Sequence, residues 1–315
     1  MLAAAALTAC GQPHGRPVRV IIPRGASFTE ATDSLARGKI VKWPTGFRIL
    51  ARIRGKDRNI KPGTYLLKPG TSWAEVLSAL NGGLGLVNSV TIPEGFALSQ
   101  ISPLLARRLS LPLDSVKAAV RDTALRSRLD VPTPMLEGYL FPDTYAFPDG
   151  TTARAAVTEM VKRFEREWKP EWDARLIELA MNRHDIITLA SIIEKEAKLP
   201  EERPVISAVY HNRLKKQMLL QADPTVQYAL PAHTPRVLYR DLEVKSPYNT
   251  YMYAGLPPGP IASPGGPSIV AALFPANVVY LYFVAFRDGH HVFSTTLAEH
   301  ESAKKAAQAS APRGR

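Results

Sequence analysis

The segment YLLKPGTSWAEVLSAL, residues 65–80, contains the local pattern from which the architecture of this chain can be worked out. A short apolar run ends at a proline–glycine turn, and an amphipathic helical pattern follows from Trp73 to Leu80. Proline suits the end of a strand because it cannot donate to a sheet ladder, and glycine permits the tight turn. Thr71 can cap the helix, and Glu75 places an acid in its first turn. The segment therefore predicts a strand, a turn and a helix.

The same succession occurs on both sides of this segment. Residues 20–27 precede a helical pattern that runs through Leu35, with Ser27 as cap and Glu30 in the first turn. Residues 90–95 precede another helical pattern. Three copies indicate a structural repeat of strand, turn and helix.

The rest of the chain is richer in helical patterns. Helices are predicted over 186–198 and 204–216, and a β-hairpin over 279–296, with its turn at 287–290. The predicted fold class is α+β, a small βααβ module followed by a larger mixed α+β domain.

The domain boundaries follow from composition. Residues 17–85 form the basic module, and Asn81–Gly85 is the best linker. Residues 86–300 form the larger domain, and 301–315 a basic flexible tail. Residues 1–16 are set apart as an export signal or the remnant of a membrane anchor.

The segment 65–80 also resembles a LysM module, the small βααβ unit that binds N-acetylglucosamine polymers. The resemblance implies a glycan-binding role for the basic module. The alternative is that its turns only connect strands to helices, without any ligand.

The 315 residues are 45% hydrophobic and 22% charged, as in an ordinary globular protein, and the formal net charge is +12. Residues 16–68 carry thirteen Lys or Arg and three acids, a net charge of +10. An anionic membrane surface, an acidic polymer or a nucleic acid could bind such a stretch. Because no helix-turn-helix, zinc-finger or RNP-like pattern accompanies it, we expect no nucleic-acid partner.

The N-terminus begins with an apolar run, MLAAAALTA, followed at once by Cys10. The run is too short to span a bilayer. Residues 7–10 resemble a bacterial lipobox, in which Cys10 would carry the lipid; a truncated membrane anchor and the apolar start of a cytosolic protein are the alternatives. The first two place the body of the protein outside the cytoplasm.

Several kinds of chemistry are excluded by the motifs. The seven histidines form no His-Glu-x-x-His pattern, and the lone cysteine allows no cysteine-based zinc site. Nucleotide-binding glycine motifs and a Gly-x-Ser-x-Gly elbow are also missing. We therefore expect neither a metal nor a cofactor, and carboxylates become the candidates for catalysis.

Two stretches combine carboxylates with apolar surroundings. Residues 136–145 hold Glu137 and Asp143 among three aromatic residues, a composition that suits a sugar-binding groove or an aromatic core. The helix predicted from Ile186 is apolar until Glu194 and Glu196, which fall on opposite borders of its apolar face. Partial desolvation raises the pKa of a carboxyl, which suits a general acid. The helical wheel does not choose between the two glutamates.

Six motifs together are similar to the endolytic murein transglycosylase family of bacteria, over roughly residues 85–300. They are EGYLFPDTY (137–145), ASIIEKE (190–196), NRL (212–214), LQADPTVQY (220–228), YNTY (248–251) and GLPPGPIASPG (255–265). The family cleaves nascent peptidoglycan strands at the cytoplasmic membrane. The resemblance implies that Glu196, the last residue of ASIIEKE, is the catalytic acid, and that the N-terminus holds a membrane-spanning helix, where this chain has only the short apolar run.

The implied mechanism needs one essential glutamate. Glu196 protonates the glycosidic oxygen between N-acetylmuramic acid and N-acetylglucosamine, and the muramic 6-hydroxyl closes a 1,6-anhydro ring. The residues expected to hold the sugar are Gln221, Asp223, Tyr248, Asn249 and Thr250, with Glu137 and Asp143 either holding it or bracing loops.

The expected partners are peptidoglycan strands, the membrane through the N-terminus, and peptidoglycan synthases. The expected location is the inner membrane, with the body on the periplasmic side. Two alternatives stay open, a non-catalytic wall-binding scaffold and a hydrolytic muramidase.

Overall fold

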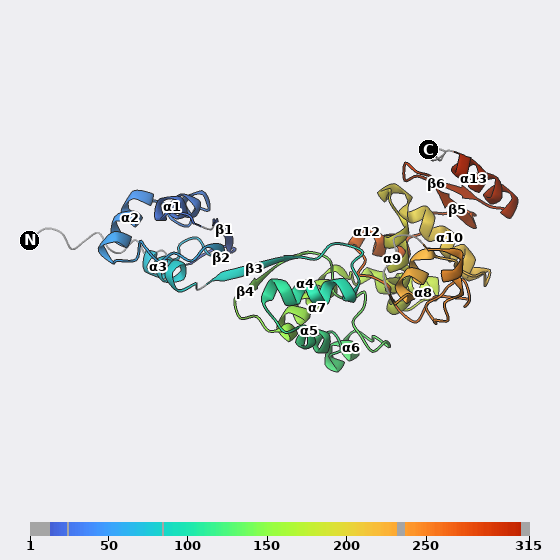
Figure 1. Cartoon of the computed structure of the whole chain (residues 1–315), viewed down its shortest axis with the longest axis horizontal. Coiled ribbons are helices and arrows are strands. Elements are labelled where there is room, and N and C mark those ends of the chain that lie inside the picture. Colours follow the sequence, from blue (N-terminus) through green and yellow to red (C-terminus); the bar gives the residue numbers. More distant parts are fainter. Residues whose placement is uncertain (1–12, 24, 84, 232–236, 310–315) are drawn as a thin grey trace, which may run out of the picture. The chain divides into compact units, whose positions relative to one another are not determined.

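Each of the three strand–turn–helix repeats expected from the sequence is present in the computed structural model, which describes residues 13–23, 25–83, 85–231 and 237–309. The chain divides into two units (Figure 1). The first contains the described residues up to Val90 together with 108–110 and 144–152, and the second contains the remainder. The predictions made for Cys10 and for residues 1–12 lie outside the described residues.

The first unit is a four-stranded sheet with helices. Its elements are β1 (Val18–Ile22), α1 (Phe28–Arg37), α2 (Pro44–Ile53), β2 (Gly63–Leu67), α3 (Trp73–Gly82), β3 (Leu86–Thr91) and β4 (Thr144–Pro148). The succession β1–α1–α2–β2 has the βααβ order expected for the basic module. Binding of glycan by this module stays a prediction.

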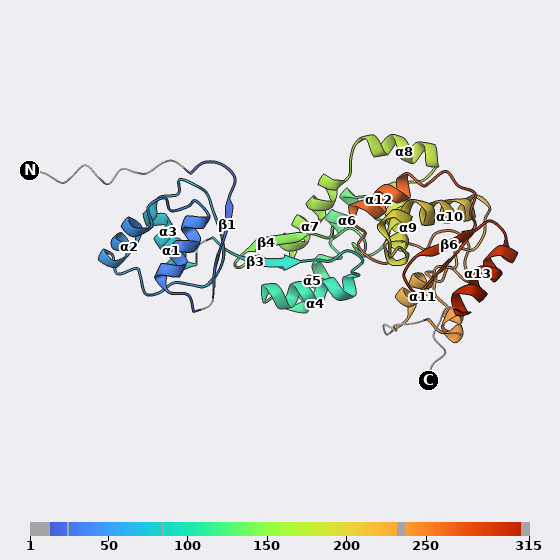
Figure 2. The ribbon, with the colours of Figure 1, turned by 90° about the horizontal axis from the view of Figure 1, so that it is seen from above.

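The sheet has the strand order β1-β2-β3-β4. β1 pairs antiparallel with β2, with Val20 opposite Tyr65, and β2 pairs antiparallel with β3. The Asp149 N–H donates to the Leu86 carbonyl at one end of the β3–β4 pair, at 3.1 Å. β3 and β4 lie side by side although residues 92–143 separate them in the sequence (Figure 2).

The residue that caps the helix is the predicted one in α1 and differs from the predicted one in α3. Ser27 caps α1 in a capping box with Glu30, as expected. In α3 the cap is Ser72 and not Thr71, since the Ser72 hydroxyl accepts the Glu75 N–H and the Glu75 carboxylate accepts the Ser72 N–H. Such a reciprocal pair satisfies two backbone donors that the helix leaves free.

The first unit has its own apolar core. The inward residues of β1 and β2 pack against α1, α2 and α3, with Leu35, Phe47, Tyr65 and Leu77 fully buried. The Tyr65 hydroxyl is satisfied there because it donates to the Lys61 carbonyl at 2.6 Å. Burial of these side chains is what stabilises a module of this size.

The second unit is mainly helical. Its elements are α4 (Leu98–Leu109), α5 (Leu113–Ala119), α6 (Thr123–Arg128), α7 (Ala153–Glu167), α8 (Glu171–Leu179), α9 (Arg183–Glu196), the 3₁₀ helix η1 (Pro200–Glu202), α10 (Arg203–Lys215), α11 (Asp223–Ala229), the 3₁₀ helix η2 (Tyr239–Glu243), α12 (Gly266–Leu273), β5 (Tyr282–Ala285), β6 (His291–Ser294) and α13 (Leu297–Ala309). α9 packs against α10 and α12, and α13 packs against the β5–β6 hairpin.

Two boundaries differ from the expectation. Asn81 and Gly82 are the last residues of α3, and Gly83 ends the helix in the left-handed region, so this segment is a helix end that leads into β3 rather than a linker. The tail expected to be flexible from residue 301 is helical through Ala309, because α13 continues there after packing on the hairpin.

Candidate functional site

Helix α9 presents two glutamates at the end of a buried helix. It begins at a capping box between Asn182 and Asp185, and every residue from Ile186 to Ile193 is buried. The backbone turns extended at Ala197, which ends the helix directly after Glu196. The last helical turn therefore places polar side chains at the limit of the apolar core.

The structure distinguishes the surroundings of Glu194 and Glu196, which the helical wheel could not do. The Glu194 carboxylate accepts the Gly265 N–H at 3.0 Å and the Ser268 hydroxyl at 2.7 Å, and Arg203 lies 3.7 Å away. Its side chain is only 8% exposed. Glu194 therefore holds the N-terminal end of α12 in place.

Glu196 lies in different surroundings and stays partly exposed. It accepts a hydrogen bond from the Tyr210 hydroxyl at 2.9 Å. The pKa of Glu196 is raised to about 7, chiefly by burial and also by the negative charge of Asp223, against the lowering effect of Tyr210 and Arg213. A carboxyl with this pKa can both give and take a proton near neutral pH.

A second carboxylate, at the start of α11, acts electrostatically on Glu196. Asp223 is exposed and accepts a hydrogen bond from the Tyr251 hydroxyl at 2.5 Å. Tyr251 belongs to the YNTY motif, so this bond joins two motifs that are distant in the sequence. The pair fixes the position of a negative charge beside the candidate acid.

Arg213 fixes the backbone segments around Glu196 and Asp223. Its guanidinium is buried and donates to the carbonyls of Leu281 at 2.6 Å, Leu220 at 2.8 Å and Leu219 at 3.3 Å. These bonds tie α10 to β5 and to the segment that leads into α11. Tyr251 and Arg213 belong to the YNTY and NRL motifs, but their roles could not be predicted from the sequence, and neither could that of Tyr210. The signal for Tyr210 is its place on the same helix as the NRL motif, two residues before Asn212.

Two of the residues expected to hold sugar have a bracing role instead. Asn249 is fully buried, and its amide donates to the carbonyls of Leu242 and Val244. The Thr250 hydroxyl is buried against Ala222 N–H at 3.0 Å and the Thr225 hydroxyl at 2.9 Å. Their side chains face the protein interior, so this geometry does not support a contact with sugar.

Gln221 and Tyr248 remain accessible. Gln221 is exposed, has a positive φ of 50° and donates its N–H to the Thr250 carbonyl at 3.0 Å. Tyr248 is partly buried and its ring lies 4.8 Å from the ring of Tyr228. Both can contact a ligand placed beside α11.

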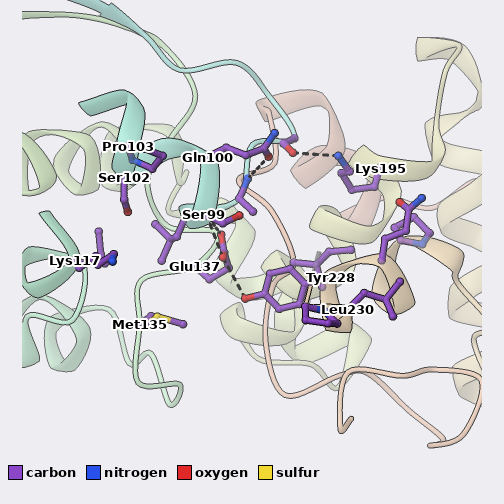
Figure 3. A pocket seen from close by; sticks show the side chains of 18 of the residues that line it. Ser99, Gln100, Ser102, Pro103, Lys117, Met135, Glu137, Lys195, Tyr228 and Leu230 are labelled. Carbon is purple, nitrogen blue, oxygen red and sulfur yellow. Dashed lines mark hydrogen bonds between the residues drawn. The ribbon is translucent and has the colours of Figure 1, made fainter. Parts of the chain in front are cut away.

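Glu137 lies at the base of a cavity of about 840 Å³ in the second unit (Figure 3). Its Oε1 and Oε2 accept the Leu98 N–H at 2.9 and 3.2 Å, and Oε2 also accepts the Tyr228 hydroxyl at 3.2 Å. Burial raises the pKa of Glu137 to about 7, against the lowering effect of these donors. Glu137 therefore both lines the cavity and links the start of α4 to α11.

The residue after Glu137 has to be glycine. Gly138 has a φ of +83°, and a Cβ at this position would lie 2.4 Å from Pro260. The close approach packs the EGYLFPDTY motif against the proline-rich GLPPGPIASPG motif. Any other residue would be strained in conformation and would also push the two motifs apart.

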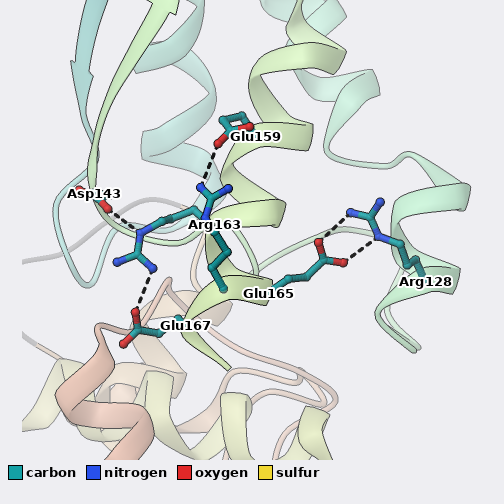
Figure 4. Close-up of polar contacts among 7 residues, drawn as sticks. Arg128, Asp143, Glu159, Arg163, Glu165 and Glu167 are labelled. Carbon is teal, nitrogen blue, oxygen red and sulfur yellow. Dashed lines mark hydrogen bonds and ion pairs between the residues drawn. The ribbon is translucent and has the colours of Figure 1, made fainter. Parts of the chain in front are cut away.

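Asp143 belongs to an ion-pair cluster on α7 (Figure 4). Arg163 donates to Asp143 at 2.7 Å and to Glu167 at 2.9 Å, and its guanidinium lies 4.4 Å from the centre of the Phe141 ring. Of the two roles considered for Asp143, these contacts favour bracing.

The described residues meet neither the requirements of a metal site nor those of a membrane-spanning helix. In the part of the chain that the structure describes, no three or more His, Cys, Asp or Glu side chains gather in a way that could hold a metal ion. Among the helices of the described ranges, none has both the length and the apolar character that crossing a membrane requires.

The architecture and the six motifs define a family. The chain belongs to the YceG-like family, whose family model matches residues 20–306. This finding confirms the resemblance inferred from the motifs, and it agrees with the predicted α+β class.

Two relatives and one solved structure give the comparison in detail. An endolytic murein transglycosylase of Bacillus subtilis (strain 168) is 35% identical over 303 residues, which are 91% of this chain and 84% of that protein. A protein of the same name from Streptococcus pneumoniae serotype 2 (strain D39 / NCTC 7466) is 28% identical, over 90% of this chain and 57% of the relative. The crystal structure of a yceG-like protein from Listeria monocytogenes is similar, with a TM-score of 0.65 and 35% identity over 91% of this chain and 98% of that one.

Proposed function

We propose that this protein is an endolytic lytic transglycosylase that cleaves the bond between N-acetylmuramic acid and N-acetylglucosamine in nascent peptidoglycan, with Glu196 as its acid and base. The observation that carries the proposal is the place of Glu196, partly exposed at the end of buried α9 with a pKa of about 7. The names of two relatives support the substrate. A non-catalytic scaffold is not favoured.

The proposed reaction conserves atoms and protons without a water molecule. Protonated Glu196 donates its proton to the glycosidic oxygen, the bond to muramic C1 breaks, and an oxocarbenium-like centre develops there. The ionised Glu196 then accepts the proton of the muramic 6-hydroxyl as this oxygen bonds to C1. The products are a 1,6-anhydro-muramic end and a free N-acetylglucosamine 4-hydroxyl.

Asp223 would stabilise the positive charge that develops on the sugar ring. It is an exposed carboxylate beside Glu196, held by Tyr251. A hydrolase would need such a second carboxylate to activate water or to attack the sugar. The product therefore decides between the transglycosylase and the muramidase.

Digestion of peptidoglycan is expected to leave 1,6-anhydro-muramic ends, which lack the mass of one water molecule, because an internal hydroxyl replaces water as the nucleophile. Cleavage is expected inside strands as well as near their tips. Mass spectrometry of the glycan fragments, with the reaction run in oxygen-18 water, measures both.

Reducible ends that have taken up oxygen-18 would identify the protein as a muramidase instead. Release of single disaccharide units only, from the start of the digestion, would contradict the endolytic part of the proposal.

For the location, we propose that the protein works outside the cytoplasm at an anionic membrane surface. An exposed apolar surface on the first unit supports this. Trp43, Ile49 and Ile53, at the start and along one side of α2, are 63%, 55% and 77% exposed, and Arg48 and Arg52 lie between them in the sequence. Exposed large apolar side chains interspersed with arginine are typical of helices that lie at the lipid interface. Peptidoglycan synthases stay a predicted class of partner.

The double variant Ile49→Ser/Ile53→Ser is expected to bind phosphatidylglycerol vesicles about tenfold more weakly than the wild-type chain, because it removes two apolar contacts with lipid. Co-sedimentation measures the bound fraction, which is also expected to fall as salt is added. Ile177→Ser is the matched control, since Ile177 is 83% exposed on α8 of the second unit. If the double variant and the control bind the vesicles equally, or if the wild-type chain binds neutral vesicles equally well, the proposed membrane contact through α2 is contradicted.

A further inference from the structure

Two residues that line the cavity beside Glu137 are sequence neighbours of the candidate catalytic carboxyl groups. Lys195 lines the cavity and is followed directly by Glu196, and Pro224 lines it directly after Asp223. The cavity and the candidate catalytic carboxyl thus share α9 and α11. Because α11 has only seven residues, Tyr228 at the cavity lies within about two helical turns of Asp223.

The charges around the cavity favour an anion. Three cations, Lys117, Arg121 and Lys195, are among its lining residues, and in Figure 3 Lys117 and Lys195 lie on opposite sides of Glu137. Among the described residues that line it, Glu137 is the one acid, and its carboxyl is buried and engaged with Leu98 and Tyr228.

The contacts that these three cations make within the protein leave them available to bind an anionic ligand. Arg121 donates to the backbone carbonyl of Lys117 at 3.0 Å, and Lys195 donates to that of Gly95 at 3.3 Å. Lys117 pairs at 3.8 Å with Asp114, whose side chain is almost fully exposed. Such an exposed pair contributes little and exchanges readily for another anion.

The remaining walls are mostly apolar and of modest size. They come from the side chains of Leu98, Leu113, Val120, Met135, Leu230 and Ile261. A pocket with apolar walls and a few cations at its sides suits a ligand that carries small aliphatic groups together with carboxylates.

We propose that this cavity binds the peptide stem of peptidoglycan, the short peptide of alanine and carboxylate-bearing residues that is attached to the lactyl group of muramic acid. The inference rests on the proposed function, because the stem is a substituent of the sugar that would react at Glu196. The alanine methyl groups contact the apolar walls, and the stem carboxylates pair with Lys117, Arg121 and Lys195. The cavity then selects strands that still carry their peptides.

Isothermal titration calorimetry with two soluble probes tests the proposal on the full chain. A muramyl tetrapeptide is expected to bind at least about tenfold more tightly than N-acetylmuramic acid alone, because charge-assisted hydrogen bonds are added. The double variant Lys117→Ala/Arg121→Ala is expected to lose most of this difference. Arg107→Ala is the matched control, an exposed arginine of α4 that does not line the cavity, and it is expected to keep the difference.

Equal affinity for the two probes, or an undiminished preference in the double variant, would overturn the inference. Both readouts measure binding alone, and the proposed function is judged by the anhydro product. A wild-type chain that yields anhydro ends but shows no preference for the muramyl peptide rejects the peptide site and keeps the function. A wild-type chain that prefers the muramyl peptide but yields hydrated ends keeps the peptide site and rejects the proposed function.

Discussion

Replacing Glu196 by Gln is expected to lower the rate of strand cleavage by about 10²–10⁴-fold while the fold stays intact. The amide keeps the shape of the side chain and can still accept the Tyr210 hydroxyl, but it cannot donate a proton to the glycosidic oxygen. The rate of formation of anhydro ends and the melting temperature are the measurements. In the wild-type enzyme the same rate is expected to fall as the pH rises above about 7, because ionised Glu196 has no proton to give.

Glu194→Gln is the matched control for this result. Glu194 is two residues away on the same helix, and its carboxylate holds Gly265 and Ser268 rather than facing the site. This variant is expected to lower the melting temperature and to keep most of the cleavage rate of the folded protein. Equal losses of rate in both variants at an unchanged melting temperature would show that the acid has been assigned wrongly.

Arg213→Met is expected to lower the free energy of unfolding by about 3 kcal/mol, because three backbone carbonyls lose a charged donor inside the protein. The bond to the Leu220 carbonyl is fully buried, so hydration cannot replace the lost donor there. Denaturant unfolding monitored by circular dichroism measures the change.

Arg175→Met serves as the comparison for Arg213. Arg175 also donates to a backbone carbonyl, that of Leu273 at 2.8 Å, but its side chain is 28% exposed and water can replace it. Its loss is expected to cost about 1 kcal/mol. Equal costs for the two variants would contradict the role given to Arg213 as a buried tie between α10, β5 and the start of α11.

The parts of the fold that depend on neighbouring residues were predictable from the sequence. The strand, turn and helix of each repeat follow from proline, glycine and the apolar period, and the capping box of α1 follows from residues three apart. The cap of α3 was misassigned by one residue because Thr71 and Ser72 are adjacent and both can cap a helix. An extended segment that ends at Asp149 was predictable, but its pairing as β4 was not, since the partner strand β3 lies more than fifty residues earlier.

The sequence motifs predicted which segments form the site but not the role of each side chain in it. Helical geometry brought Glu194 and Glu196 to the borders of an apolar face, but their difference depends on α12, which packs on one border only. Asn249 and Thr250 have residue types that suit a sugar, and their burial depends on carbonyls and hydroxyls from other segments. Without the tertiary contacts, a polar residue that braces a loop cannot be distinguished from one that faces a ligand.

The place of β4 in the sheet bears on how the protein is synthesised. A nascent chain that has left the ribosome as far as β3 holds three strands of the first sheet, and the edge that β4 will occupy stays open until residues 92–148 have followed. An unpaired strand can pair with another chain, so during this interval β3 can form contacts that β4 replaces in the finished sheet, where β4 is the edge strand. For the same reason a gene fragment that stops at residue 90 encodes a sheet without its fourth strand.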